Sequence, residues 1–130
     1  MTNSIANNVI RIPANIKENF FRYWLEFLRP FHGLTEREMD VFSEMLRHRY
    51  ELSFKVKDDI ILDKLILGDE YRKRIIKDLG VSASHFQVMM SKFRRIHLII
   101  DSRINAKFIP HISEEEGMFK LLFLFDLSKK

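Results

Sequence analysis

Apolar residues recur every three to four positions in successive segments between Ile16 and Ile96, and the pattern changes after His97 to short apolar runs. The first spacing is typical of helices that pack on one face, and the second is typical of strands. Glycine and proline, with four and three residues, are too scarce for a many-turned all-β fold. This order predicts an α+β fold that is mainly helical and ends in a C-terminal β-hairpin and a final strand.

Five helices and three strands are expected from this patterning. The clearest start signal is a capping box, in which the Thr35 hydroxyl accepts from the N–H of Glu38 and the Glu38 carboxylate accepts from the N–H of Thr35. Pro30 and Gly33 are expected to end the first helix, and Asp69 to cap the fourth. The helices are predicted at residues 16–29, 35–50, 58–67, 69–79 and 82–96, and the strands at 97–100, 103–109 and 118–126.

Residues 72–91 fit the pattern of a helix–turn–helix, in which two helices cross steeply around a turn that contains glycine. Gly80 takes the turn, and Ser82 is placed to cap the second helix. Ile76 stands where a small residue is usual, which implies a wider crossing. Apolar residues occupy all five positions that such a unit buries: Ile75, Leu79, Val81, Phe86 and Met89.

The length of 130 residues suits one domain. We expect a flexible N-terminal arm at residues 1–13 and a single winged-helix-like domain at 14–130, with the helix–turn–helix unit at 69–96 and a wing and final strand at 97–127. The absence of cysteine excludes disulfide scaffolds, thiolate zinc sites and cysteine nucleophiles. No secretory signal and no apolar run of membrane-spanning length is visible, so an intracellular location is expected.

The distribution of charge favours nucleic-acid binding by the helix–turn–helix unit. The formal net charge is +4, but residues 69–107 hold nine basic and four acidic residues, whereas the flanking segments are neutral or slightly acidic. Basic residues that neutralise phosphates release counterions, and this release drives binding to DNA. The predicted nucleic-acid-binding residues are Arg72, Lys73, Lys77, Ser82, Ser84, His85, Gln87, Ser91, Lys92, Arg94, Arg95, Arg103 and Lys107.

Other interpretations of this surface stay open. Gln87 is the one strong base reader on the proposed recognition helix, since it can pair bidentately with adenine. Val88, or Met90 beside it, would be exposed and apolar there, which suits contact with a protein. The basic residues of the first helix could form a solvated face, and Lys92, Arg94 and Arg95 could complement the helix dipole.

The sequence offers almost nothing for catalysis or cofactor binding. It contains no Gly-rich phosphate loop and no ordered Ser, His and Asp triad. We therefore expect a protein that is not an enzyme and that holds no metal and no cofactor. The five histidines share no metal-ligand spacing: His32, His48, His85, His97 and His111.

Several segments within roughly residues 20–127 carry a family resemblance: PFHGLTEREMDVFSEML, RYELS, HFQVMMSKFRR with the IID that follows, FIPHI and FKLLFLFDL. They resemble a family of small uncharacterised winged helix–turn–helix-like proteins of crAss-like tailed bacteriophages. The resemblance implies a phage protein made in a bacterial host, and it supplies no functional residues.

The helix–turn–helix pattern and this resemblance together predict a non-catalytic protein that binds double-stranded DNA, as a phage transcriptional regulator or genome-associated protein in the host cytoplasm. The alternative is a virion structural or assembly component that contacts other capsid or tail proteins. A homodimer or phage structural proteins are further expected partners. No membrane and no small-molecule substrate are expected.

Overall fold

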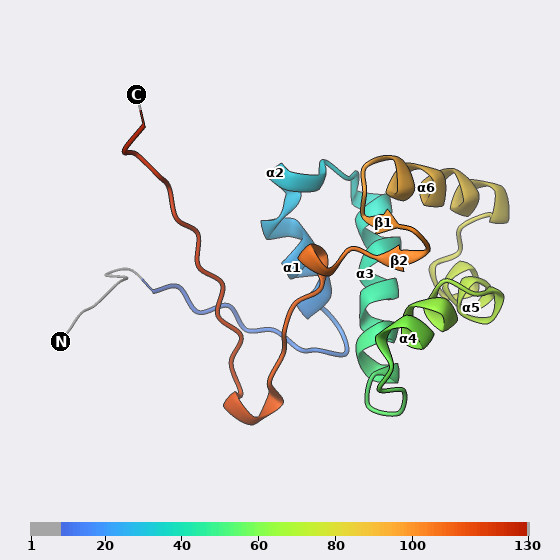
Figure 1. The fold of residues 1–130 in the computed structure, drawn as a ribbon, viewed down its shortest axis with the longest axis horizontal. Coiled ribbons are helices and arrows are strands. Elements are labelled where there is room, and N and C mark those ends of the chain that lie inside the picture. The colour runs from blue at the N-terminus through green and yellow to red at the C-terminus, as the bar shows by residue number, and fades with distance from the viewer. Residues whose placement is uncertain (1–8, 130) are drawn as a thin grey trace.

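Residues 9–129 are described by the structure, a computed structural model. In that range six α-helices precede a two-stranded antiparallel sheet, so the prediction of a mainly helical chain with a small hairpin is confirmed (Figure 1). Residues 1–8 of the predicted arm lie outside the described residues. The elements are α1 (Phe20–Phe27), α2 (Arg29–His32), α3 (Glu36–Leu52), α4 (Asp59–Ile66), α5 (Asp69–Leu79), α6 (Ala83–Arg95), β1 (Ile99–Ile100), β2 (Arg103–Ile104) and the 3₁₀ turns η1 (Ala106–Phe108) and η2 (Glu114–Glu116).

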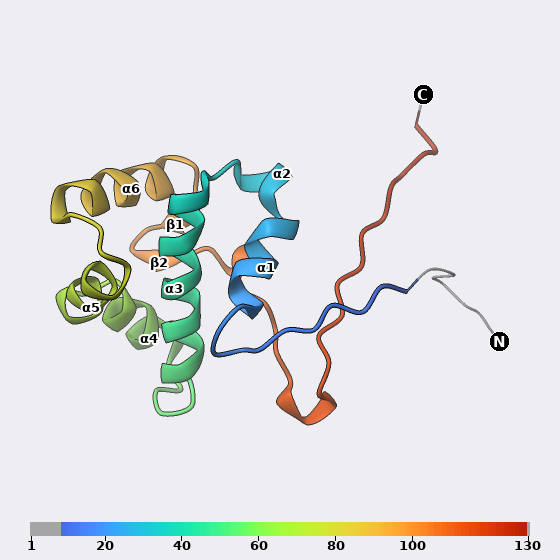
Figure 2. The ribbon, with the colours of Figure 1, turned by 180° about the vertical axis from the view of Figure 1, so that it is seen from behind.

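The long helix α3 is the centre of the fold. Helix α1 packs on one side of it and α4 and α5 on the other, as the two opposite views show (Figure 1 and Figure 2). The core between these helices is apolar, and the ring of Phe42 on α3 meets the ring of Phe93 on α6 edge-on, with 5.2 Å between centroids. Both rings are fully buried. No helix within residues 9–129 combines the length and the apolar character that crossing a membrane requires.

The capping box predicted at the start of α3 is confirmed. The Thr35 hydroxyl accepts from the N–H of Glu38 at 3.3 Å, and the Glu38 carboxylate accepts from the N–H of Thr35 at 2.8 Å. The helix predicted at 58–67 is also present, and the Asp58 carboxylate caps it by accepting from two backbone N–H groups. At α5 the expected cap is wrong: Gly68 takes the N-cap position and Asp69 is the first helical residue.

The first helix is shorter than predicted, and Pro30 does not end it. Helix α1 ends at Phe27, and Pro30 stands in the first turn of the separate helix α2. A proline is tolerated there because the first turn of a helix leaves its N–H groups without intrahelical partners. Gly33 ends α2 in the left-handed conformation, with φ of 62°.

The β-structure is smaller than the sequence pattern indicates. Ile99 pairs with Ile104 and Ile100 with Arg103, around a two-residue turn at Asp101–Ser102 in which both φ angles are positive. Positive φ at both central residues is the geometry that a tight hairpin needs. The ladder stops at Ile104, because η1 follows where the second strand was expected to continue.

The final strand predicted at 118–126 is wrong. This segment has no strand partner and runs away from the helices in an extended form (Figure 1). Phe119 packs edge-on against Phe20 and Trp24, at 5.1 and 5.6 Å between centroids. The apolar run therefore begins beside α1 and pairs with no strand among the described residues, and a strand cannot form without a partner.

Candidate nucleic-acid interface

Helices α5 and α6 are consecutive and are joined by a short turn, in the segment 69–96 where the sequence predicts a helix–turn–helix unit. Gly80 ends α5 in the left-handed conformation, with φ of 66°. The Ser82 hydroxyl then caps α6 by accepting from the N–H of His85 at 3.0 Å. Of the five apolar positions expected to be inside, Leu79 is half-buried and the other four are buried: Ile75, Val81, Phe86 and Met89.

Two polar contacts from α3 hold this unit in place. The guanidinium of Arg37 donates to the backbone carbonyl of Leu79 at the end of α5. Lys92 of α6 donates to the Glu38 carboxylate at 2.8 Å. Burial alone would raise the pKa of Glu38, but the hydrogen bonds from Lys92 and from the Thr35 backbone outweigh it and lower that pKa. Glu38 is therefore both a helix cap and the ion-pair partner that anchors α6.

The hairpin is anchored by a buried carboxylate. Asp63 of α4 is fully buried and accepts from Arg49 Nε at 2.7 Å and from Arg103 Nε at 2.6 Å. Arg103 belongs to β2, so this carboxylate links α3, α4 and the hairpin. Arg103 was expected to contact nucleic acid, and the structure places its guanidinium in this internal ion pair. Lys92 was also expected to contact nucleic acid, and it too forms an ion pair within the chain, with Glu38.

The outward face of α6 is polar along most of its length. Phe86, Met89, Met90 and Phe93 point inward and are buried. The opposite face is exposed, with one apolar residue, Val88, among polar and basic ones: Ser84, His85, Gln87, Ser91, Arg94 and Arg95. Ser82 lies exposed at the start of the same helix. This face is therefore mostly polar and accessible to solvent.

Several exposed cations of α5, α6 and the segment after the hairpin make no ion pair among the described residues. Within residues 9–129, no ion pair involves Lys73 or Lys77 on α5, Arg94 or Arg95 on α6, or Lys107 after the hairpin. All five are exposed. The two remaining arginines of α5 have acidic neighbours on their own helix: Arg72 lies 4.0 Å from Asp69 and Arg74 lies 3.2 Å from Glu70.

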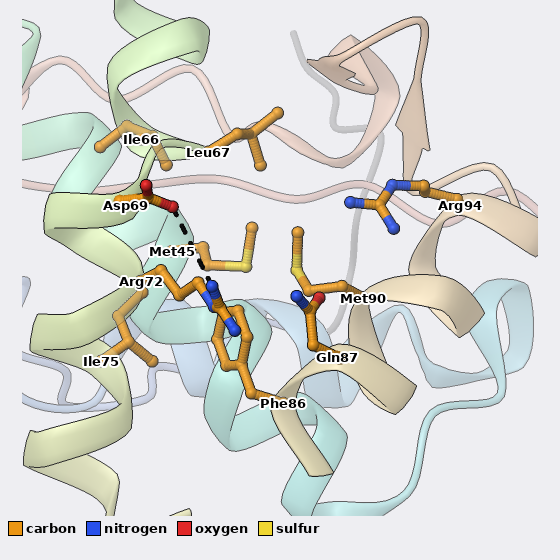
Figure 3. Close-up of a pocket in the computed structure, with 10 residues that line it drawn as sticks. All are labelled: Met45, Ile66, Leu67, Asp69, Arg72, Ile75, Phe86, Gln87, Met90 and Arg94. Atoms are coloured by element: carbon orange, nitrogen blue, oxygen red, sulfur yellow. Dashed lines mark ion pairs between the residues drawn. The ribbon is translucent and has the colours of Figure 1, made fainter. Parts of the chain in front are cut away.

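Three of the candidate residues meet at a small cavity of about 210 Å³ between α5 and α6 (Figure 3). Arg72, Gln87 and Arg94 line it together with apolar side chains such as Met45, and the guanidinium of Arg72 lies 6.0 Å above the ring of Phe86. The Nε of Arg72 is buried and has no hydrogen-bond partner. This N–H donor therefore meets no acceptor within residues 9–129.

The sequence analysis missed the residues that position the interface. The capping box identifies Glu38 from the sequence. Nothing local indicates its ion pair with Lys92, which lies 54 positions away. Asp63 carried no signal at all, since a lone aspartate in a helix is ordinarily exposed. None of the thirteen candidate residues belongs to the one group of described side chains with metal-ligand spacing, Glu44, His48 and Asp78.

No protein-family model, no curated protein and no solved structure matches this chain. The functional argument therefore rests on the geometry of α5, α6 and the hairpin.

Proposed function

We propose that this chain is a non-catalytic protein that binds double-stranded DNA through a winged helix–turn–helix made of α5, α6 and the β1–β2 hairpin. One observation carries the proposal: the exposed face of α6 is polar, and exposed cations without ion pairs within residues 9–129 occur on α6, on the preceding helix α5 and just after the hairpin. A helix of this kind fits the major groove, with phosphates held on both sides.

The exposed polar residues and the exposed cations are assigned to different parts of the DNA: the base edges and the phosphates. Gln87 lies halfway along α6, at the edge of the exposed face beside the cavity, and its amide can pair with adenine. Ser84 and Ser91 lie one turn before and after it along the helix. The phosphates are assigned to the cations that make no ion pair among the described residues: Lys73, Lys77, Arg94, Arg95 and Lys107. Lys92 and Arg103 hold α6 and the hairpin in position instead.

This division gives a sharp test with a matched control. Arg95→Ala removes a free cation, so it should weaken binding to all duplexes alike and reduce the slope of log Kobs against log[salt] by about 0.9. Lys92→Met removes one positive charge from the same turn of α6. Because Lys92 is paired with Glu38, this variant should lower stability by about 1 kcal/mol and leave that slope unchanged.

Fluorescence anisotropy with a labelled duplex across a salt series measures both slopes. Gln87→Ala should leave the slope as it is and reduce discrimination between duplex sequences. Absence of binding at low salt would overturn the proposal. Equal effects of Arg95→Ala and Lys92→Met would overturn the assignment of roles within it.

A second candidate function is an assembly component of a phage particle, and the exposed C-terminal segment favours it. Leu124, Phe125 and Leu127 are 79%, 86% and 87% exposed, in a segment that pairs with no strand among residues 9–129. Such a segment gains stability when another protein chain covers it. Mass spectrometry of purified particles should then detect the chain, with residues 121–127 protected from protease; its absence from particles would remove this candidate.

A further inference from the structure

A buried histidine on α3 has a ring nitrogen with no partner. The side chain of His48 is 8% exposed, and its Nε2 makes no hydrogen bond within the described residues 9–129. Glu44 lies one helical turn earlier, and its Oε2 is 3.6 Å from this Nε2, which is too long for a hydrogen bond. Burying a polar group without a partner is costly, so a group that completes the environment of His48 would stabilise the fold.

Asp78 brings a second carboxylate to the same place from α5. One ligand atom from each of Glu44, His48 and Asp78 lies within 4.8 Å of the others. The ring of Tyr71, also on α5, packs against the imidazole at 5.4 Å between centroids and helps to fix its plane. An imidazole nitrogen with two carboxylates, converging from two helices, is a donor set for a metal ion.

We propose that Glu44, His48 and Asp78 bind one divalent first-row transition-metal ion, with Zn²⁺ as the best fit. Zinc binds imidazole nitrogen and carboxylate oxygen at about 2.0–2.2 Å, so tetrahedral ligand atoms lie about 3.4 Å apart. The distance of 3.6 Å between Glu44 and His48 already approaches this value. Asp78 is exposed and has no hydrogen bond or ion pair among the described residues, so its carboxylate is free to close on the ion.

Arg47 would compete with a metal ion for the Glu44 carboxylate, but it also has a second carboxylate partner, Glu51. Arg47 donates to the two Glu44 oxygens at 3.1 and 2.8 Å. It also donates to Glu51 at 2.9 Å. When Glu44 turns one oxygen to a metal ion, Arg47 keeps a carboxylate partner in Glu51, and the second Glu44 oxygen stays available to it.

The site would join α5 to α3. Glu44 and His48 belong to α3 and Asp78 to the last turn of α5, immediately before the turn at Gly80. A bound ion would therefore strengthen the attachment of the helix–turn–helix unit to the central helix. This inference is independent of whether that unit binds DNA.

Thermal unfolding of the full, untagged chain tests the proposal. At about a hundredfold excess of Zn²⁺ over Kd, the Tm should rise by about 5–10 °C relative to the chain in EDTA. Isothermal titration should give one ion per chain. Asp78→Asn should keep the metal-free Tm, because Asp78 is exposed, and should weaken Zn²⁺ binding at least about tenfold.

Glu70→Gln is the matched control, since Glu70 is an exposed acid on the same helix that lies outside the cluster. It should bind Zn²⁺ as the unaltered chain does. Absence of a zinc-dependent rise in Tm would overturn the proposal. Equal binding by Asp78→Asn and Glu70→Gln would place the ion elsewhere and overturn it as well.

Discussion

His32 shows how a single side chain can be fixed in one protonation state. Its Nδ1 accepts from the N–H of Leu34 at 2.9 Å, so its Nε2 carries the proton and donates to the carbonyl of Leu25 at 2.8 Å. The bond from Leu34 requires the neutral ring, because a protonated Nδ1 cannot accept. Burial lowers the pKa of His32 below its ordinary value, and the hydrogen bond to Leu25 only partly offsets this. The residue ties α1 to the start of α3 in its neutral form.

Stability should therefore fall as His32 takes up a proton. Because its pKa is lower in the folded chain than the ordinary 6.5, the unfolded chain binds more protons below about pH 6.5. The contribution of His32 is complete above that pH and is lost as the pH falls through the folded pKa. Urea unfolding at about pH 8 and about pH 5.5 should show a smaller loss for His32→Gln than for the unaltered chain. An equal loss in both would contradict this role.

The buried carboxylate of Asp63 accepts hydrogen bonds from two arginines. Its removal should be among the most destabilising single changes. Asp63→Ala leaves the guanidinium of Arg49, with its side chain 12% exposed, without its closest partner. The free energy of unfolding should fall by about 3–5 kcal/mol, measured by urea unfolding. Asp59→Ala is the control: Asp59 is 73% exposed and lies 3.7 Å from Arg49, so its loss should cost less than about 1 kcal/mol.

The turn between α5 and α6 depends on the backbone of Gly80. A Cβ at this position would meet nothing within 4 Å, so a larger side chain is opposed only by the positive φ of 66°. Gly80→Ala should lower the free energy of unfolding by about 1–2 kcal/mol. Gly80→Asn should cost less, because asparagine tolerates this conformation better. Chemical denaturation of both variants checks this order, and the reverse order would contradict the left-handed turn.

Helices α5 and α6 and the hairpin share one core with α3 and should not fold alone. Phe93 of α6 is fully buried and meets Phe42 of α3, and Leu98, which precedes the hairpin, is also fully buried. A fragment of residues 69–109 would expose these side chains to water. Circular dichroism of that fragment should show little helix, whereas the full chain should unfold in one cooperative transition. A cooperative thermal transition of the fragment would contradict a shared core.

Most helices could be predicted from the sequence because their signals are local. The capping box of Thr35 and Glu38, the Asp58 cap and the glycine at position 80 act within a few residues of the chain. Pro30 misled the prediction because the same residue can end one helix or begin the next. The strand expected at 118–126 failed for another reason: an apolar run becomes a strand only where a partner edge is present.

The candidate site was predictable in part. The polar face of α6 follows from helical spacing, and the structure leaves Gln87, Arg94 and Arg95 exposed on it. The sequence could not separate Lys92 and Arg103 from the free cations. Their carboxylate partners stand 54 and 40 positions away, and only folding brings them within hydrogen-bonding distance.

The sequence by itself determined the helical order, the turn at Gly80 and the excess of basic residues around it, because caps, spacing and charge are properties of neighbouring residues. Tertiary structure decided which cations stay free, what becomes of the C-terminal apolar run, and that Glu44, His48 and Asp78 converge. These outcomes depend on contacts between segments that are distant in the sequence. Such contacts form and contribute free energy only when the chain has packed around α3.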